Sequence, residues 1–230
     1  MFVALTVLVF LQPQSADFTD LNIEGWTVHV QKAIMATRPK LWEAAKNELT
    51  CQLMRIERVV PDEPLKKIKT IPFWLHLKDP NVIGAAYHPD AGWLRAHKMD
   101  PKMARGIEVG NLANFVGWSY QQPWMLMHEL SHGYHDQFVK DGWKNAEVLS
   151  AFNEAVASHK YDDALLYNGT KHKAYAMTNE MEYFAETTES YFGVNDFFPF
   201  IRAELQILDP TGYAMMRKLW GDPAEKVPGG

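Results

Sequence analysis

Residues 127–137 read MHELSHGYHDQ and place two histidines, His128 and His132, four positions apart, with Glu129 directly after the first. On an α-helix, residues four apart point to the same side, so both imidazoles can bind one metal ion. Glu129 then lies beside the ion, where its carboxylate can take a proton from water. Chance alone produces HExxH in about a few per cent of chains of this length. The pattern therefore indicates a zinc site but does not establish one by itself.

A catalytic zinc site needs a third protein ligand and a position left open for water. After His132 the sequence runs GYHDQFVKDGW and lacks the further Gly and His of the metzincin pattern. His135 stands seven residues after His128, two turns along the helix, so we expect it to be a neighbour of the site and not a ligand. The third ligand is therefore expected to be acidic and to come from another helix.

Two later glutamates compete for this role. Glu154 lies in FNEAVAS and has no carboxylate one helical turn further on, whereas Glu182, in NEMEYFAETTES, is followed four residues later by Glu186. A histidine ligand usually donates its second ring N–H to a carboxylate, so Glu182 and Glu186 can supply ligand and acceptor from one helical face. Glu180 fails this test because Phe184 stands four after it. We favour Glu182, and a solvated acidic face is the alternative interpretation of this helix.

The pair HELSH and AYAMTNEMEYFAE resembles the protease domain of anthrax lethal factor and its relatives, a gluzincin family of zinc metallopeptidases. In that family a tyrosine precedes the glutamate ligand by seven residues, and here Tyr175 stands seven before Glu182. The matching stretch covers residues 107–192 and is most specific in its second half, where Thr178, Asn179 and both carboxylates fall in register.

The resemblance implies a zinc-dependent endopeptidase that holds one Zn²⁺ ion. His128, His132 and Glu182 would bind the ion, and Glu129 would act as the general base. Tyr175 would donate a hydrogen bond to the developing oxyanion, and Glu186, by its spacing from Glu182, is expected to orient a histidine. These assignments agree with the roles inferred from residue type and spacing.

In this architecture the segment 106–115, GIEVGNLANF, is expected to supply an edge strand that pairs with an extended substrate. The residues next to the substrate would be Glu108, Val109, Gly110 and Asn111. The segment YHPDAGW is expected to be a loop that forms a wall of the cleft through Tyr87, His88 and Trp93.

The expected fold class is α+β, a zincin-like metallopeptidase with a small twisted mixed sheet, the HExxH helix and a mostly helical C-terminal lobe. Alternation and apolar runs predict strands over 26–30, 71–77 and 106–109. Apolar periodicity and capping residues predict helices over 39–60, 123–138, 146–159, 179–193 and 208–221, with loops over 79–100 and 161–173. We expect a single catalytic domain over 17–230, with an α/β lobe to about residue 120 and a helical zinc-binding lobe over 121–230.

Composition limits the classes of partner. The chain has 230 residues, is 47% hydrophobic and carries a formal net charge of -5, so it can bury a sizeable core and has no broad basic surface for nucleic acid. Its one cysteine, Cys51, excludes an intrachain disulfide and is expected to be buried in the helix over 39–60.

The N-terminal segment 1–16 has the pattern of a secretory signal peptide. An apolar run over 2–11 is followed by small residues, and cleavage after Ala16 would export the protein to the periplasm or beyond the cell. The run is short for a membrane span, so no stable span is expected after cleavage. An uncleaved anchor or a buried strand are the alternatives.

Three functions fit these patterns. The first is an endopeptidase that acts on a peptide or protein substrate with a zinc-activated water. The second is a catalytically silent zinc-site protein that serves as a binding module. The third is a zinc hydrolase of a non-peptide amide, such as a cell-wall crosslink. The presence of both Glu129 and Tyr175 favours the endopeptidase over the silent binding module, because a module that only binds would need neither residue.

Overall fold

The structure is a computed structural model and describes residues 17–226. The segment 1–16 lies outside the described residues, so the expected signal peptide stays a prediction. Within residues 17–226, no helix is both long enough and apolar enough to cross a membrane.

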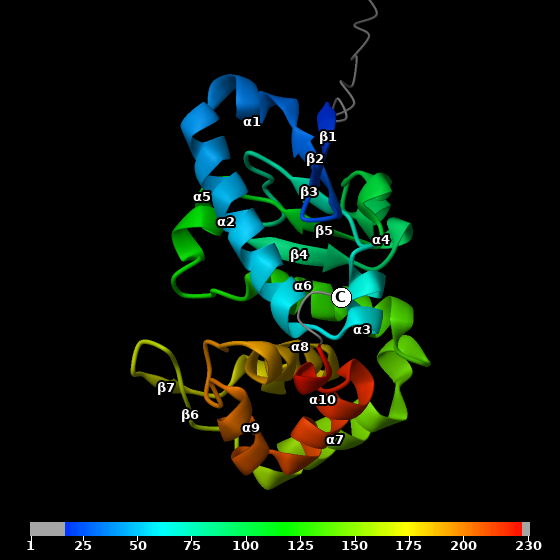
Figure 1. Cartoon of the computed structure of the whole chain (residues 1–230), viewed down its shortest axis with the longest axis vertical. Helices are drawn as coiled ribbons and strands as arrows, with labels where there is room; N and C mark the ends of the chain where they lie inside the picture. Colours follow the sequence, from blue (N-terminus) through cyan, green and yellow to red (C-terminus); the bar gives the residue numbers. More distant parts are fainter. Residues whose placement is uncertain (1–16, 227–230) are drawn as a thin grey trace, which may run out of the picture.

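A five-stranded mixed sheet forms the upper part of the molecule in Figure 1. Its strands in chain order are β1 (Phe18–Ile23), β2 (Trp26–Gln31), β3 (Phe73–Leu75), β4 (Ala85–His88) and β5 (Gly106–Val109). The spatial order is β1-β2-β3-β5-β4, in which β2, β3 and β5 are parallel and the two outer strands are antiparallel to their neighbours. The two-residue strands β6 (Ala164–Leu165) and β7 (Lys171–His172) form a separate hairpin.

Helices account for most of the remaining chain. The α-helices are α1 (Lys32–Thr37), α2 (Pro39–Val59), α3 (Asp62–Ile68), α4 (Ala91–Ala96), α5 (Leu112–Trp118), α6 (Met125–Phe138), α7 (Ala146–Ser158), α8 (Glu180–Phe192), α9 (Arg202–Leu208) and α10 (Pro210–Trp220). The 3₁₀ turns are η1 (Pro101–Met103), η2 (Gly142–Lys144), η3 (Tyr175–Met177) and η4 (Pro223–Glu225). The fold is thus α+β, with a small mixed sheet and a mostly helical C-terminal half, as the sequence predicted.

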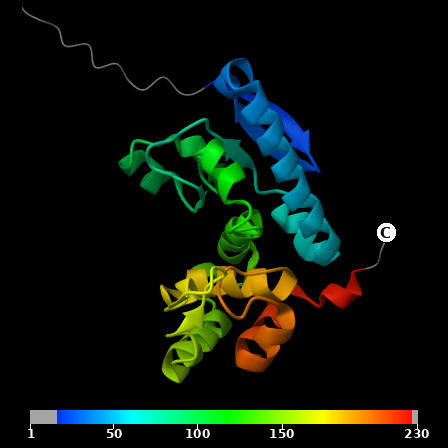
Figure 2. The ribbon, with the colours of Figure 1, turned by 90° about the vertical axis from the view of Figure 1, so that its left-hand side faces the viewer.

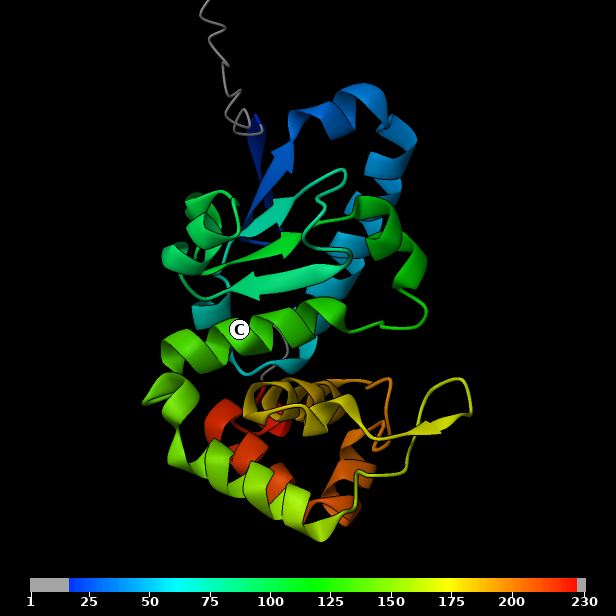
Figure 3. The ribbon, with the colours of Figure 1, turned by 180° about the vertical axis from the view of Figure 1, so that it is seen from behind.

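Helix α6 lies between the two parts of the molecule. In Figures 2 and 3 the sheet, α2 and α5 lie above α6, and α7 to α10 lie below it. One hydrophobic cluster joins both parts, because it contains Val28 and Phe73 of the sheet, Leu126 and Leu130 of α6, and Trp220 of α10. This packing gives α6 a fixed position relative to both the sheet edge and α8.

The segment 79–100, predicted to be a loop, contains the strand β4 and the helix α4, so that prediction was wrong. Asp90 caps α4 by accepting hydrogen bonds from the backbone N–H groups of Gly92 and Trp93. The sequence pattern missed β4 because its four residues are too few to show alternation, and because Gly84 and Pro89 flank it.

The predicted edge-strand role of the segment 106–115 is also wrong. Strand β5 lies between β3 and β4, and β4 occupies the sheet edge. All four residues of β5 are buried, and Glu108 has no exposed surface. The backbone N–H and C=O groups of an interior strand are hydrogen-bonded to the strands on both sides. Glu108 and Val109 therefore cannot pair with an extended substrate, contrary to the expectation from the sequence. Gly110 is buried too, and Asn111 caps α5 through its side chain.

Cys51 is exposed, in contrast to the sequence-based expectation. The buried face of α2 contains Trp42, Ala45, Leu49, Leu53 and Ile56. Cys51 lies two residues from both Leu49 and Leu53, a rotation of about 200° on an α-helix, and therefore points away from that face.

The first hairpin was not predicted from the sequence. Strands β1 and β2 are joined by Glu24 and Gly25, whose φ angles are 49° and 82°. Positive φ at both central residues defines the tight turn that matches the twist of paired strands. Glycine adopts this conformation without strain, so Gly25 carried the only local signal for the hairpin.

Candidate metal centre

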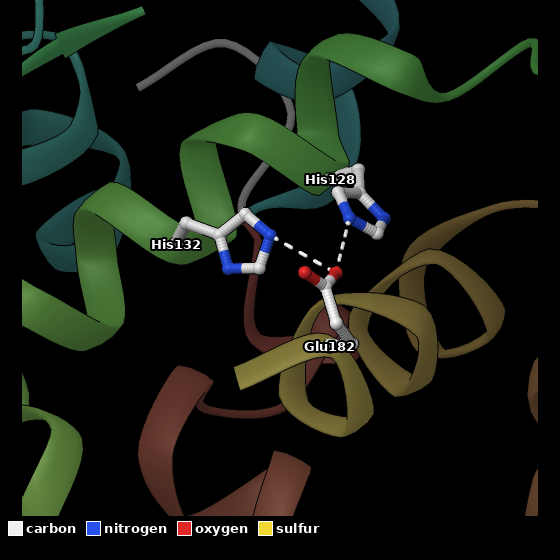
Figure 4. A group of neighbouring side chains, drawn as sticks. All are labelled: His128, His132 and Glu182. Atoms are coloured by element: carbon white, nitrogen blue, oxygen red, sulfur yellow. Dashed lines mark hydrogen bonds and ion pairs between the residues drawn. The ribbon is translucent and has the colours of Figure 1, made fainter. Parts of the chain in front are cut away.

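His128 and His132 of α6 and Glu182 of α8 face one another across the interface between the two helices (Figure 4). His128 Nε2 lies 3.0 Å from Glu182 Oε2, and His132 Nε2 lies 3.3 Å from the same oxygen. Neighbouring ligand atoms on a tetrahedral ion with bonds of about 2.0–2.1 Å are separated by about 3.3–3.4 Å. Two imidazole nitrogens and one carboxylate oxygen are therefore placed where a zinc ion could be held.

The local sequence explains how these side chains reach one point. The two histidines are one turn apart on α6, and their ring centroids are 4.9 Å apart. Asn179 caps α8 by accepting hydrogen bonds from the backbone N–H groups of Met181 and Glu182. This cap fixes the first turn of α8, from which Glu182 points toward α6 (Figure 4).

The charges of the group favour a cation. Burial lowers the pKa of His128, but hydrogen bonds with Glu182 and Glu189 outweigh this effect and raise the pKa well above its ordinary value. Burial raises the pKa of Glu182, but the hydrogen bonds with His128 and His132 outweigh it and lower the pKa well below its usual range. A divalent ion bound here would take the place of a proton on His128 that is shared with the Glu182 carboxylate.

Glu154, the competing candidate for third ligand, does not belong to this group. Its side chain on α7 accepts a hydrogen bond of 2.8 Å from the Thr211 hydroxyl, at the surface. Glu182 is the acidic residue that the structure brings to both histidines.

Glu189, and not the expected Glu186, lies within hydrogen-bond distance of His128 Nδ1. His128 Nδ1 donates to Glu189 Oε1 at 2.8 Å, whereas Glu186 Oε1 is 3.6 Å away, too far for a hydrogen bond. Burial raises the pKa of Glu189 to about 7. For Glu186, burial and the nearby Glu189 raise the pKa well above its ordinary value. A spacing of seven residues from Glu182, two helical turns, was the available signal for Glu189.

We therefore expect Glu189→Gln to weaken zinc binding by about 10–100-fold, the usual effect of losing a carboxylate that orients a histidine ligand. The matched change Glu186→Gln should alter affinity by less than about threefold, since Glu186 makes no direct bond to His128. Competition with a fluorescent chelator measures both affinities. The reverse order of effects would restore Glu186 as the orienting residue.

Glu129 is held against the sheet edge. Its Oε2 accepts a hydrogen bond of 2.8 Å from the backbone N–H of Tyr87, on β4, and the residue is 9% exposed. One carboxylate oxygen is thus engaged by the protein, while Oε1 is left for proton transfer. Glu129 follows His128 in the chain and lines the cavity beside it.

A cavity of about 710 Å³ opens beside His128 and Glu129. Its other walls include Ile83, Gly84 and Ala85, before and at the start of β4, and Tyr175 of η3. The Tyr175 ring centroid is 6.3 Å from that of His128, and the side chain is 48% exposed. Burial, followed by the Glu182 charge, raises the pKa of the Tyr175 hydroxyl, so it keeps its proton as a donor.

The walls predicted from YHPDAGW were incorrect. None of the three side chains lines the cavity beside His128. Tyr87 points its hydroxyl to Asp136 at 2.7 Å, His88 is buried against Glu108, and Trp93 stacks on His97. The Tyr87 side chain thus packs on the C-terminal half of α6, and the contact of this segment with Glu129 is made by the Tyr87 backbone N–H.

His135 is fully buried and belongs to none of the groups that could hold an ion in the described part of the chain. Its ring centroid lies 4.8 Å from that of Trp143 and 4.6 Å from that of Phe184. Burial, followed by the nearby His132, lowers the pKa of His135 to about 4. The residue therefore acts as a neutral packing group beside the candidate metal centre.

His135→Leu is expected to leave metal content unchanged and to increase stability in acid relative to wild type. Below the ordinary pKa of 6.5 the unfolded chain takes up a proton that folded His135 does not bind until about pH 4. Wild-type stability therefore falls as pH falls, by about 2 kcal/mol between pH 6.5 and 5 from this residue. Urea unfolding of both proteins with a chelator present measures the difference. Equal pH dependence would show that His135 is not neutral when folded.

Comparison with known proteins shows a likeness at the level of structure. The chain matches no protein-family model and no curated protein. Its structure is similar to that of the PRO-PRO endopeptidase (PPEP-2) from Paenibacillus alvei, with a TM-score of 0.49 and 18% sequence identity over 75% of this chain and 91% of that chain.

Proposed function

We propose that the protein is a zinc-dependent endopeptidase of the gluzincin type, related to the lethal factor protease domain. The convergence of His128, His132 and Glu182 beside a cavity that also exposes Glu129 supports this proposal. Two histidines and one glutamate are a ligand set of catalytic zinc, which leaves a coordination position for water.

Zinc held by these ligands would polarise a carbonyl and lower the pKa of water toward neutrality. Glu129 would take the proton from the attacking water and deliver it to the leaving amine. Its bond to the Tyr87 amide keeps the carboxylate at the edge of the cavity during both transfers. Glu189 would hold His128 in a single ring orientation through Nδ1.

An extended substrate would pair with β4 and not with β5. The Gly110 N–H donates to the Gly84 carbonyl, and Ala86 pairs with Glu108. Gly84 and Ala86 therefore direct their backbone N–H and C=O groups toward β5. The backbone groups of the alternate residues, Ala85 and Tyr87, therefore point away from β5, toward the open edge of the sheet. Tyr87 uses its N–H for Glu129, and Ala85, at the cavity, is left to align a peptide by strand addition.

Incubation of the zinc-loaded protein with a mixed peptide library tests the proposal. We expect new peptide termini, identified by mass spectrometry, that disappear when a chelator removes the metal. Loaded protein that leaves every peptide uncut would favour a silent binding module. Release of cell-wall fragments without peptide cleavage would favour an amide hydrolase of another class.

Tyr175→Phe is expected to lower kcat by about 10²–10³-fold with little change in KM. The hydroxyl would donate to negative charge that develops only in the transition state, so its loss should affect that state selectively. Steady-state kinetics on a peptide found in the library measure the effect. Tyr167→Phe, at an exposed tyrosine outside the cavity lining, is the control. A change confined to KM would instead make Tyr175 a substrate-binding residue.

A further inference from the structure

A second group of side chains that could bind a metal lies on the face of the sheet opposite α6. It consists of His76, just after β3, Asp79 in the following loop, and Glu108 on β5, with one ligand atom of each within 4.8 Å of the others. Ile107 and Val109 point into the main core, to which α6 contributes. Because side chains alternate along a strand, Glu108 points to the opposite face, where Trp74, Leu94 and Met103 form a smaller cluster.

The buried atoms of this group lack partners. His76 Nε2 and Glu108 Oε1 are 3.7 Å apart, too far for a hydrogen bond, and neither has another partner in the described part of the chain. His76 is 9% exposed and Glu108 is fully buried. A buried carboxylate oxygen without a partner is costly. An ion placed between these atoms would satisfy both at once.

The surroundings hold the ligands in place without a metal. The His76 backbone N–H donates to the Val109 carbonyl at 2.9 Å, and the Asp79 N–H donates to the Gly110 carbonyl at 2.6 Å. The second oxygen of Glu108 is bound to His88 Nε2 at 2.8 Å. This is the arrangement in which a hydrogen bond from a neighbour orients a ligand carboxylate.

We propose that His76, Asp79 and Glu108 bind a second divalent transition-metal ion, with zinc as the expected occupant. Two carboxylates match the charge of the ion, and one imidazole with two carboxylate ligands suits zinc better than calcium, which takes six to eight oxygens. The ion would connect the end of β3 and the loop after it to the interior strand β5. It would lie across the sheet from Glu129, so its role would be to stabilise the sheet that carries β4.

Zinc binding in a His128→Ala background separates this site from the HELSH group. His128 lies near His132 and Glu182 and also near Glu186 and Glu189, a further group that could hold an ion, so its removal disrupts both groups between α6 and α8 and leaves the site on the sheet intact. Equilibrium dialysis with metal analysis should then find about two zinc ions per wild-type chain and about one per His128→Ala chain. Zinc should also raise the Tm of His128→Ala.

Adding Asp79→Asn to His128→Ala should lower the remaining zinc affinity at least about 10-fold and remove the Tm response. Asp79 is only partly buried and asparagine has its shape, so folding is preserved; circular dichroism checks this. His76→Ala in the same background should act alike, whereas His97→Ala, at an exposed histidine outside the group, should keep the ion.

The proposal is overturned if His128→Ala binds no zinc, or if its zinc is retained in both the Asp79→Asn and His76→Ala combinations. Because only metal content and unfolding are measured, the result does not depend on whether the protein cleaves peptides.

Discussion

Glu129→Gln is expected to bind zinc as tightly as wild type and to lose peptidase activity by about 10²–10⁴-fold, the usual contribution of general acid–base catalysis. Glutamine has the shape of glutamate, and its amide oxygen can keep the hydrogen bond from the Tyr87 N–H. The variant therefore removes the proton acceptor and little else. Metal analysis and kcat/KM on the same preparation measure the two properties together.

Glu154→Gln, an exposed glutamate on α7 that bonds Thr211, is the matched control and should keep full activity. Equal cleavage by Glu129→Gln and wild type would refute the proposed mechanism. Loss of zinc from Glu129→Gln would show instead that Glu129 contributes to metal binding.

Glu182→Ala should release the zinc and with it all peptidase activity. Removal of a direct ligand should weaken binding by more than the 10–100-fold typical of an orienting carboxylate. It also leaves His128 and His132 without the negative charge that they share. Bound zinc after dialysis, measured on the folded protein, reports the effect.

The comparison with Glu154→Ala separates the two candidate ligands. That variant should retain zinc, since Glu154 lies on α7 outside the group. Loss of zinc in Glu154→Ala alone would overturn the ligand assignment and the resemblance to lethal factor. Glu182→Gln keeps the shape of the side chain. Loss of zinc in this variant too would show that the effect of Glu182→Ala does not come from a folding defect.

The HELSH and NEMEYFAE segments could be predicted as helices because capping and periodicity are local. Asn179 caps α8 as its position indicated, and the histidine pair follows from helical geometry. The proximity of Glu182 to His128 and His132 was predicted from the chemistry of zinc ligands and from the resemblance. The structure brings the three together.

The strand order could not be predicted, because it depends on pairing between distant segments. Nothing near 106–109 indicates that β4 would lie outside it, although four buried residues in a row are typical of an interior strand. Glu108 within that strand was interpreted as a substrate contact, when its buried carboxylate meets His88 and approaches His76. Helical spacing from Glu182 places both Glu186 and Glu189 on the face toward α6. Which of them reaches His128 depends on the rotation of α8 against α6, which the spacing does not specify.

The hydrogen bond to Glu129 comes from the backbone N–H of Tyr87 and not from its side chain. Every amino acid except proline supplies this N–H, so the side chain at position 87 can vary without releasing Glu129. Proline alone is forbidden there by chemistry, while any shift of β4 along its neighbour would move the amide away. The buried Tyr87 side chain, which bonds Asp136, is a separate constraint on this position, so the contact with Glu129 depends only on the register of β4 against β5.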